Sequence, residues 1–355
     1  MTQKNNQLGN DIQNILETMG LFCSLENCID NEIATSFEFN LKNLKDFQKL
    51  LKAVQVLKIC YHKNITLEES EKYHFKIKIP KSKSILTTDD YEDFECQNKL
   101  SVLLGVDENG EKIEFDLRKS IHSLIAGATG MGKTNILNNI IYSLSNKNTK
   151  DEISFYLIDI KKTLSVWNDI PQIETTTAES PRDAYDILEE ISLIIEDRFK
   201  KLAKMKKTKA DEKTFPYIVV IIDELADLML SGLKKYIEDQ IAHIAQIGRA
   251  VNVSLIIATQ SPIAKVCTNL IKANCPTVIA LKTVSIPTSR VILDNKNAFE
   301  LAGAGDCIIR NADYPCEKKF KALFLEEDKI LEYIKGVEKC SKRKKRKMQP
   351  PIVIV

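Results

Sequence analysis

Short apolar segments alternate with helical stretches between residues 121 and 325. The apolar segments lie at 121–126, 153–159, 217–223, 254–259 and 277–281. Segments that are apolar on both faces are typical of central parallel strands covered by helices, and their alternation with helices favours right-handed βαβ units. The pattern therefore predicts an α/β fold with a mainly parallel central sheet.

The clearest helical pattern covers residues 180–205. Ser180 occupies the N-cap position, Pro181 the first helical position, and Asp183 lies three residues after the cap. Apolar residues recur at helical spacing from Ala184 to Leu202 and form one stripe. We expect this stripe to pack in the core, with no further role.

The first hundred residues are rich in lysine and asparagine and carry no clear motif. Periodicity at 44–59 predicts a helix, and alternation at 75–79 predicts a strand. Asn109-Gly110, between two strand-like runs, predicts a hairpin that leads into the first strand of the α/β fold. We expect a small α+β domain over 1–100 and the α/β domain over 101–335.

The last residues, 336–355, contain six consecutive basic residues at 342–347 before a Pro-Pro pair. Such a block cannot bury itself, so the sequence predicts a basic, disordered tail. Two interpretations stay open for it: a solvated tail without a specific role, or a non-specific grip on a phosphate backbone or an acidic partner.

Composition adds only limits. The 51 Lys and Arg against 49 Asp and Glu leave a formal charge of +2, which indicates no partner for the chain as a whole. The nine cysteines are odd in number and form no C-x-x-C pair, which favours reduced thiols in a cytoplasmic protein and no zinc site. The longest apolar run, near 218–222, is too short for a membrane span, so a membrane role would need a partner protein.

The segment GATGMGKT fits the phosphate-binding pattern G-x-x-x-x-G-K-[ST], after a predicted strand and before a predicted helix. Its glycines permit backbone turns that point N–H groups at a phosphate. Lys133 would reach the β- and γ-phosphates, and the Thr134 hydroxyl would bind Mg²⁺. We expect a nucleoside triphosphate to be held by Gly127, Ala128, Thr129, Gly130, Met131, Gly132, Lys133 and Thr134.

Polar residues follow two other apolar segments. Asp223, at the end of one, would bind the magnesium through water, and Glu224 would orient and deprotonate the attacking water. An ordinary strand followed by a helix cap accounts for Asp223 alone but not for both acids. Gln260, at the carboxyl edge of the next strand, is a candidate γ-phosphate sensor, although polar strand ends are common.

A series of longer segments follows in order along the chain: HSLIAGATGMGKTN, FYLIDIKK, PYIVVIIDELADLM, AQIGRAVNVSLIIATQSP, LIKANCPTVIALKT, SRVILD and LAGAGDCII. Together they resemble the motor domain of the FtsK/SpoIIIE family of DNA translocases. The resemblance covers Leu103 to Leu325 and implies a RecA-like P-loop domain that forms a hexameric ring around double-stranded DNA and hydrolyses ATP between subunits.

The resemblance assigns further roles by position. It implies that Lys133, Glu224 and Gln260 act in ATP hydrolysis with Mg²⁺ held at Thr134 and Asp223. In QIGRAV, Arg249 stands where the family has an arginine that completes the neighbouring subunit's site, and a cation supplied there would stabilise the charge of the transition state. A surface arginine at a helix end is the alternative interpretation.

Arg198, on the capped helix, is a second candidate for the arginine that completes the neighbouring site. The resemblance itself points to Arg249.

DNA-facing positions depart from the family pattern. Ser261 stands where an arginine is expected after A-T-Q, and SIPT is one residue shorter than the family segment that carries a lysine, whereas Lys272 and Arg290 are kept. Because Lys and Arg supply most of the affinity for duplex DNA, these losses weaken the expected grip. The lysine-rich segment 200–213 compensates, or else it is only a solvated helix end.

The leading hypothesis is an ATP-driven, ring-forming translocase of double-stranded DNA that serves transfer or segregation of a mobile element. It would be cytoplasmic, hexameric, and brought to a membrane or target by a partner protein. One alternative is a related secretion or conjugation motor that acts on a protein substrate. Another is a slow nucleotide-dependent regulatory module.

Overall fold

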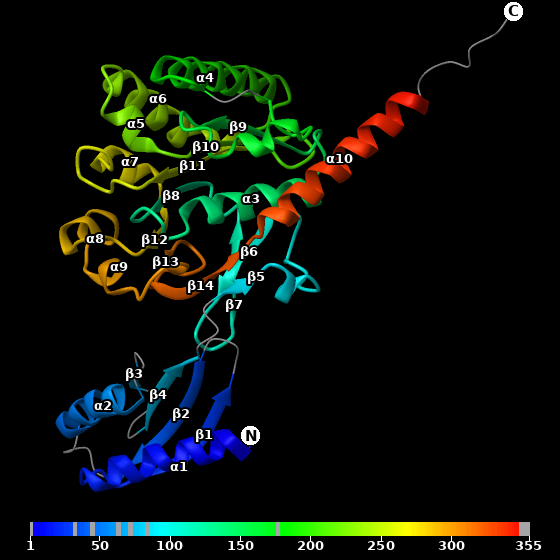
Figure 1. Cartoon of the computed structure of the whole chain (residues 1–355). Helices are drawn as coiled ribbons and strands as arrows, with labels where there is room; N and C mark the ends of the chain where they lie inside the picture. The colour runs from blue at the N-terminus through cyan, green and yellow to red at the C-terminus, as the bar shows by residue number, and fades with distance from the viewer. Residues whose placement is uncertain are drawn as a thin grey trace, which may run out of the picture. The chain divides into compact units, whose positions relative to one another are not determined.

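The computed structural model describes residues 3–30, 34–42, 47–61, 65–69, 74–81, 85–174 and 178–347 (Figure 1). The chain forms two compact units. One contains Met1–Ile85 and the hairpin tip Val106–Lys112, and the other contains Leu86–Gly105 and the chain from Ile113 onward. The division falls after Ile85 and not near residue 100, because β5 (Leu86–Thr87) pairs with β14 (Lys318–Phe324) in the second unit.

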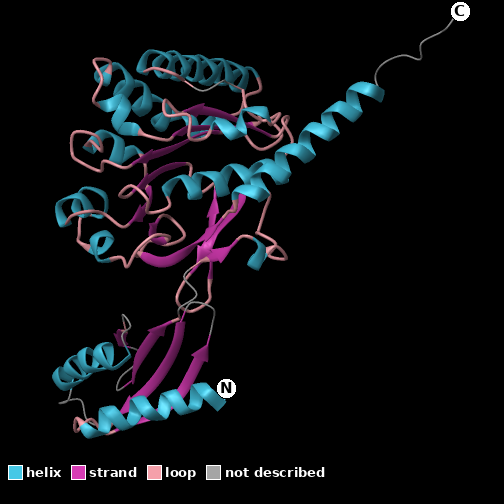
Figure 2. Cartoon of the chain, viewed as in Figure 1, coloured by secondary structure: helices cyan, strands magenta, loops and turns pink. Residues whose placement is uncertain are grey.

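The first unit is a four-stranded antiparallel sheet with two helices (Figure 2). The strand order is β1-β2-β4-β3. The predicted helix at 44–59 corresponds to α2, and the predicted strand at 75–79 corresponds to β4. The elements are α1 (Gln3–Thr18), β1 (Cys23–Asp30), β2 (Ala34–Leu41), α2 (Phe47–Tyr61), β3 (Thr66–Glu69) and β4 (His74–Pro80).

The second unit is built on a ten-stranded sheet of order β7-β6-β14-β13-β12-β8-β11-β10-β9, with β5 at the side of β14. Every apolar segment predicted as a strand is one. The strands not yet located are β6 (Ser101–Val106), β7 (Lys112–Asp116), β8 (His122–Ala126), β9 (Ile153–Ile158), β10 (Tyr217–Ile222), β11 (Val253–Thr259), β12 (Thr277–Leu281) and β13 (Asp306–Arg310).

This sheet is mixed, so the expectation of a mainly parallel sheet is not confirmed for the whole of it. The neighbours β12, β8, β11, β10 and β9 are parallel. β13 runs antiparallel to both β12 and β14. A short connection between consecutive strands allows only an antiparallel pair, and β13 and β14 are joined by residues 311–317 alone. The parallel half is the part that holds the predicted site.

Helices cover both faces of this sheet (Figure 1). Along each parallel strand, successive side chains enter the two cores in turn, with Val220 and Ile222 on one face and Val219 and Ile221 on the other. One core is covered by α4 (Pro181–Lys204), α5 (Leu225–Met229), α6 (Lys234–Ile247), α7 (Asn269–Asn274), α8 (Ile286–Leu293) and α9 (Asn297–Glu300). The other is covered by α3 (Lys133–Lys147), the 3₁₀ helix η3 (Ser165–Asp169) and the start of α10 (Glu327–Lys347).

The predicted cap of α4 is confirmed. Ser180 is in extended conformation and its hydroxyl accepts a hydrogen bond from the Asp183 N–H at 3.2 Å, with Pro181 in the first turn. Ala184 and Leu202 lie in the core, as the apolar stripe predicted. The predicted hairpin at Asn109-Gly110 also forms, with Gly110 at a φ of 85°.

Helix α10 replaces much of the expected disordered tail. It continues through the basic run and ends at Lys347. Ile330 and Ile334 anchor its first turns in the core, and Lys and Arg are good helix formers, so a docked start lets the helix propagate. The remaining predicted tail, 348–355, lies outside the described residues. Within the described part of the chain, none of the helices has the length and apolar character needed to cross a bilayer.

Candidate functional site

The loop at 127–132 joins β8 to α3 in the parallel half of the sheet. Gly130 and Gly132 have φ of 78° and 105°, which side chains rarely tolerate. A Cβ on Gly127 would lie 2.6 Å from the Leu281 Cβ, so only glycine allows the loop to pass the end of β12. Each glycine of the motif therefore has a geometric reason.

The loop presents unused donors. Ala128 is tied down, because its N–H donates to the Lys282 carbonyl at 2.8 Å. In the described structure, the N–H groups that follow Ala128 in the loop have no hydrogen-bond acceptor opposite them, apart from that of Met131. The amino terminus of α3, which carries the positive end of the helix dipole, lies directly after this loop. These features together form an anion cradle suited to phosphate oxygens. The N–H groups in question belong to Thr129, Gly130, Gly132, Lys133 and Thr134.

Lys133 and Asp223 meet at the base of this cradle. Both are buried, at 4% and 1% exposure. The Lys133 Nζ lies 3.4 Å from the Asp223 carbonyl oxygen and 3.9 Å from its Oδ1. The Asp223 Oδ2 accepts a hydrogen bond from the Thr163 hydroxyl at 2.8 Å, but its buried Oδ1 has no hydrogen-bond partner.

A buried carboxylate oxygen without a partner is costly unless a cation or its bound water satisfies it. The Asp223 Oδ1 therefore fits Mg²⁺, with the half-buried Thr134 in the first turn of α3 as the hydroxyl ligand. The described residues contain no cluster of three or more His, Cys, Asp and Glu side chains able to hold a metal alone.

Glu224 is held by the end of β11. Its Oε1 accepts hydrogen bonds from the Thr259 hydroxyl at 2.7 Å and from the Ala226 and Gln260 N–H groups, both at 3.2 Å. Its Oε2 accepts only from the Gln260 N–H at 3.0 Å, and the Lys161 Nζ lies 4.0 Å away. The carboxylate is oriented, and Oε2 is the oxygen with room for another proton donor.

Gln260 contacts the phosphate loop directly. Its Oε1 accepts a hydrogen bond from the Thr129 hydroxyl at 2.6 Å, which leaves its NH₂ group available as a donor. The Gly127 N–H also donates to the Thr259 carbonyl at 3.2 Å. The structure thus brings together the ends of β8, β10 and β11, where the sequence predicted the phosphate loop, the acid pair and the sensor.

Two residues of the site were not singled out from the sequence. Asp159 follows β9, which pairs with β10 so that Ile158 lies beside Ile222. Thr163 donates to both carboxylates, at 3.3 Å to the Asp159 Oδ1 and 2.8 Å to the Asp223 Oδ2. Burial, with the charge of Asp223 beside it, raises the pKa of Asp159. An acid after an apolar strand was the same signal that identified Asp223.

Arg249 lies far from this edge. It is exposed on the 3₁₀ helix η4 (Gly248–Val251), which precedes β11, so it lies at the amino edge of the parallel strands. The phosphate loop follows β8 at the carboxyl edge, and the seven residues of β11 span about 20 Å. Arg249 cannot serve the site of its own subunit.

Arg198 is not available to a neighbour. It is 6% exposed, its Nη1 donates to the Val251 carbonyl at 2.6 Å, and its guanidinium lies 5.1 Å from the Phe215 ring centroid. Burial lowers the pKa of Arg198 to about 10, so it stays charged at neutral pH. Its role is to brace η4, which corrects its candidacy as the catalytic arginine.

The two predicted DNA contacts differ in accessibility. Arg290, on α8, is exposed. Lys272, on α7, is half-buried, and its Nζ lies 3.7 Å from the Asp294 Oδ1. The other oxygen of this carboxylate, Oδ2, lies 3.7 Å from the Arg310 Nη2. A phosphate would have to compete with Asp294 for Lys272.

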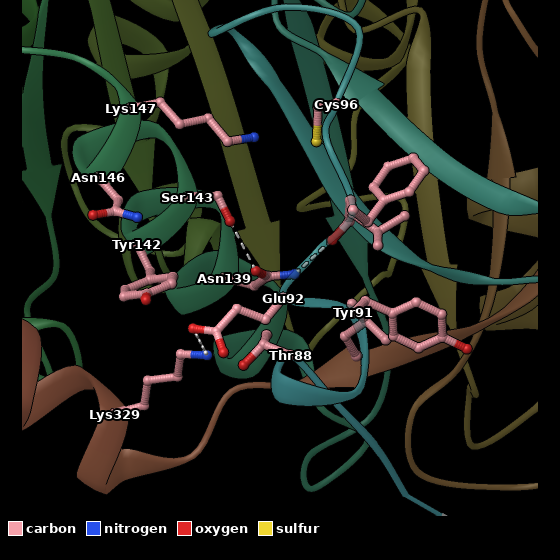
Figure 3. A pocket seen from close by; sticks show the side chains of 13 residues that line it. Thr88, Tyr91, Glu92, Cys96, Asn139, Tyr142, Ser143, Asn146, Lys147 and Lys329 are labelled. Atoms are coloured by element: carbon pink, nitrogen blue, oxygen red, sulfur yellow. Dashed lines mark hydrogen bonds and ion pairs between the residues drawn. The ribbon is translucent and has the colours of Figure 1, made fainter.

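None of these residues lines the cavity shown in Figure 3. That cavity, of about 140 Å³, lies against the side of α3 that carries Asn139 and Tyr142, and Glu92 and Lys329 also line it. It is separate from the phosphate loop.

Comparison with known proteins gives a consistent result. The model of the FtsK/SpoIIIE family matches residues 92–212 and 202–264, which include the phosphate loop, the acid pair and Gln260. The DNA translocase FtsK of Streptococcus pneumoniae is 35% identical over 261 residues, or 68% of this chain and 34% of its own. The chain belongs to the FtsK/SpoIIIE family. Lys272 and Arg290 lie beyond the residues that the family model matches.

Other members of the family align over a similar range. The DNA translocase FtsK of Bacillus cereus is 34% identical over 289 residues, which is 74% of this chain and 36% of the relative. The chain thus spans about a third of the length of the curated relatives it matches.

Solved structures share the fold. The pCW3 conjugation coupling protein TcpA, in its monomer form with ATPγS, superposes with a TM-score of 0.67 at 21% identity and covers 94% of this chain and 99% of its own. The cytoplasmic domain of the type VII secretion ATPase EccC of Thermomonospora curvata gives a TM-score of 0.58 at 22% identity over 65% of this chain and 29% of its own. The chain therefore shares its fold with these two proteins.

Proposed function

We propose that this chain is an ATP-hydrolysing motor that moves double-stranded DNA, with a RecA-like domain assembled as a hexamer. The observation that carries the proposal is the meeting of the phosphate loop, Asp223, Glu224 and Gln260 at one edge of the sheet. Membership of a family whose relatives are named DNA translocases supports the substrate. The proposal includes a role in the transfer of a mobile element. It also includes a cytoplasmic location, which fits the eight free cysteines among the described residues.

Each residue has a distinct task in hydrolysis. The loop N–H groups and Lys133 bind the β- and γ-phosphates, while Thr134 and the Asp223 Oδ1, which has no hydrogen-bond partner, would hold Mg²⁺. The metal supplies charge neutralisation on the phosphates when bound. The Glu224 Oε2 positions a water and accepts its proton, and the Gln260 NH₂ donates to the γ-phosphate.

Hydrolysis in this proposal needs a second subunit. Arg249 lies at the edge opposite to the phosphate loop, so a head-to-tail ring would place one subunit's Arg249 against the next subunit's nucleotide. A positive charge at that point stabilises the transition state and links each hydrolysis event to the neighbour's position.

A protein substrate is the second candidate function. The specific observation in its favour is the weakness of the expected DNA contacts: Ser261 replaces a cation, and Asp294 lies beside Lys272. A slow regulatory ATPase is a third reading, and steady turnover would separate it from a motor.

The test measures ATP hydrolysis with duplex DNA, with single-stranded DNA and without nucleic acid, at several salt concentrations. We expect duplex DNA to raise the rate of ATP hydrolysis, and we expect this stimulation to fall steeply as the salt concentration rises. Lys133→Ala should abolish ATP hydrolysis. A rate indifferent to duplex would exclude the DNA motor, and stimulation by a peptide instead would favour the protein substrate.

A further inference from the structure

The connection from α4 to β10 carries exposed cations that the nucleotide site does not use. We name residues 204–213, KMKKTKADEK, the lysine loop. Lys207 pairs with Asp211 at 3.1 Å, but the described residues offer no ion-pair partner to the other four lysines. Unneutralised ammonium groups this close together attract a polyanion. The five exposed lysines are Lys204, Lys206, Lys207, Lys209 and Lys213.

The same loop is hydrogen-bonded to the turn that carries Arg249. The Ala210 N–H donates to the Ala250 carbonyl at 2.7 Å. The Asn252 side-chain amide donates to the carbonyls of Asp211 and Phe215, both at 2.9 Å. The lysine loop and the Arg249 turn are therefore parts of one hydrogen-bonded assembly.

Arg198 and the backbone make this assembly tight. The Arg198 guanidinium bonds to the Val251 carbonyl and stacks on Phe215, which closes the assembly from the α4 side. Asn252 is in the left-handed region at a φ of 59°, and a Cβ on Gly248 would lie 2.9 Å from the Val253 carbonyl oxygen. Because the Arg249 turn has so little free space, we expect it to shift together with the lysine loop.

The lysine loop also lies at the amino edge of the parallel strands, as Arg249 does. It leads into β10, and the Arg118 Nη1, just ahead of β8, lies 3.5 Å from the Glu212 Oε1. A ligand bound at the lysine loop would therefore act on the edge that completes the neighbouring subunit's site.

We infer that the lysine loop binds the phosphate backbone of duplex DNA and that, through Ala250, Val251 and Asn252, this contact sets the position of Arg249. The inference rests on the proposed function and adds to it the route by which DNA accelerates hydrolysis. The loop supplies cations at the amino edge of the strands, whereas Ser261 and the shortened segment 285–288, where the family pattern has cations, follow β11 and β12 at the carboxyl edge. Arg198 is a positioning residue in this account.

The first arm of the test removes phosphate contacts from the full chain. In the triple variant Lys204→Gln, Lys209→Gln, Lys213→Gln, the slope of duplex affinity against salt falls by about 0.9 for each lysine that contacts a phosphate, and stimulation of ATP hydrolysis by duplex falls with it. The matched control removes the same charge from three exposed lysines elsewhere, in the variant Lys235→Gln, Lys265→Gln, Lys319→Gln. We expect this control to keep the wild-type salt slope and the wild-type stimulation by duplex.

The second arm keeps the lysines and cuts the connection. Asn252→Gly preserves the left-handed backbone and removes both side-chain hydrogen bonds to the loop. We expect the salt slope of duplex binding to stay at the wild-type value, while the ratio of rates with and without duplex falls towards one.

The outcomes separate the two proposals. If wild-type protein neither binds duplex nor responds to it, the proposed function fails and takes this inference with it. If wild-type protein responds but the triple variant responds equally, or the control loses as much as the triple variant, only the lysine loop is excluded. Full stimulation in Asn252→Gly overturns the link to Arg249.

Discussion

At the scale of single residues, the site depends on which buried polar atoms are satisfied. The Glu224 carboxylate is fixed by three donors, from Thr259 at the end of β11, from Gln260 after it and from Ala226 in α5, whereas the Asp223 Oδ1 is left for a cation. The sequence identified both acids, because two carboxylates after an apolar strand beside a phosphate loop are unusual. Thr163 follows from the fold alone, since only the pairing of β9 with β10 brings it to Asp223.

His122 gives a residue-scale prediction about pH. Its Nδ1 accepts from the Leu255 N–H at 3.2 Å, while its Nε2 is buried without a partner. Burial, and next the charge of Arg249, lower its pKa from 6.5 to about 4. Between pH 6.5 and pH 4, the unfolded chain therefore binds a proton at His122 that the folded chain does not bind. The free energy of unfolding decreases as the pH falls through this interval.

That pKa difference corresponds to about 3 kcal/mol across the interval. His122→Asn keeps an acceptor for the Leu255 N–H and cannot be protonated, so its stability should change less over the same interval. Urea unfolding followed by the fluorescence of the single tryptophan, Trp167 in the core of the second unit, measures this. Parallel pH profiles for the two proteins would contradict the assignment.

At the scale of elements, strand and helix patterns were predicted well where periodicity was strong. The buried segments are strands and α4 begins at its predicted cap. The sequence did not reveal that β13 and β14 turn antiparallel, because apolar runs do not encode strand direction. The helical course of the basic run also escaped prediction, since it depends on the anchoring of Ile330 and Ile334.

The cap of α4 gives an element-scale prediction. Ser180→Ala removes the acceptor for the Asp183 N–H and should lower the free energy of unfolding by about 1 kcal/mol. Ser180→Asp supplies another capping oxygen and should retain most of the stability. The urea midpoint of the tryptophan signal measures both. Equal losses in the two variants would show that the cap contributes little.

At the scale of the whole molecule, the carboxyl edge of the parallel strands holds the nucleotide machinery and the amino edge holds Arg249. The sequence motifs predicted the nucleotide machinery and the family resemblance pointed to Arg249, but neither gave the distance between them. The fold separates them by the length of a strand, which makes an isolated subunit incomplete for the proposed reaction. We therefore expect hydrolysis to be shared between neighbouring copies of the chain.

The most direct test mixes two inactive variants, Lys133→Ala and Arg249→Ala, and measures ATP hydrolysis. Each alone should be nearly inactive. In a random equal mixture, a subunit with an intact phosphate loop meets a neighbour with an intact Arg249 in roughly a quarter of the interfaces, so that fraction of the wild-type rate should return. A mixture no faster than its separate components, or an Arg249→Ala protein as active as wild type, would contradict the account.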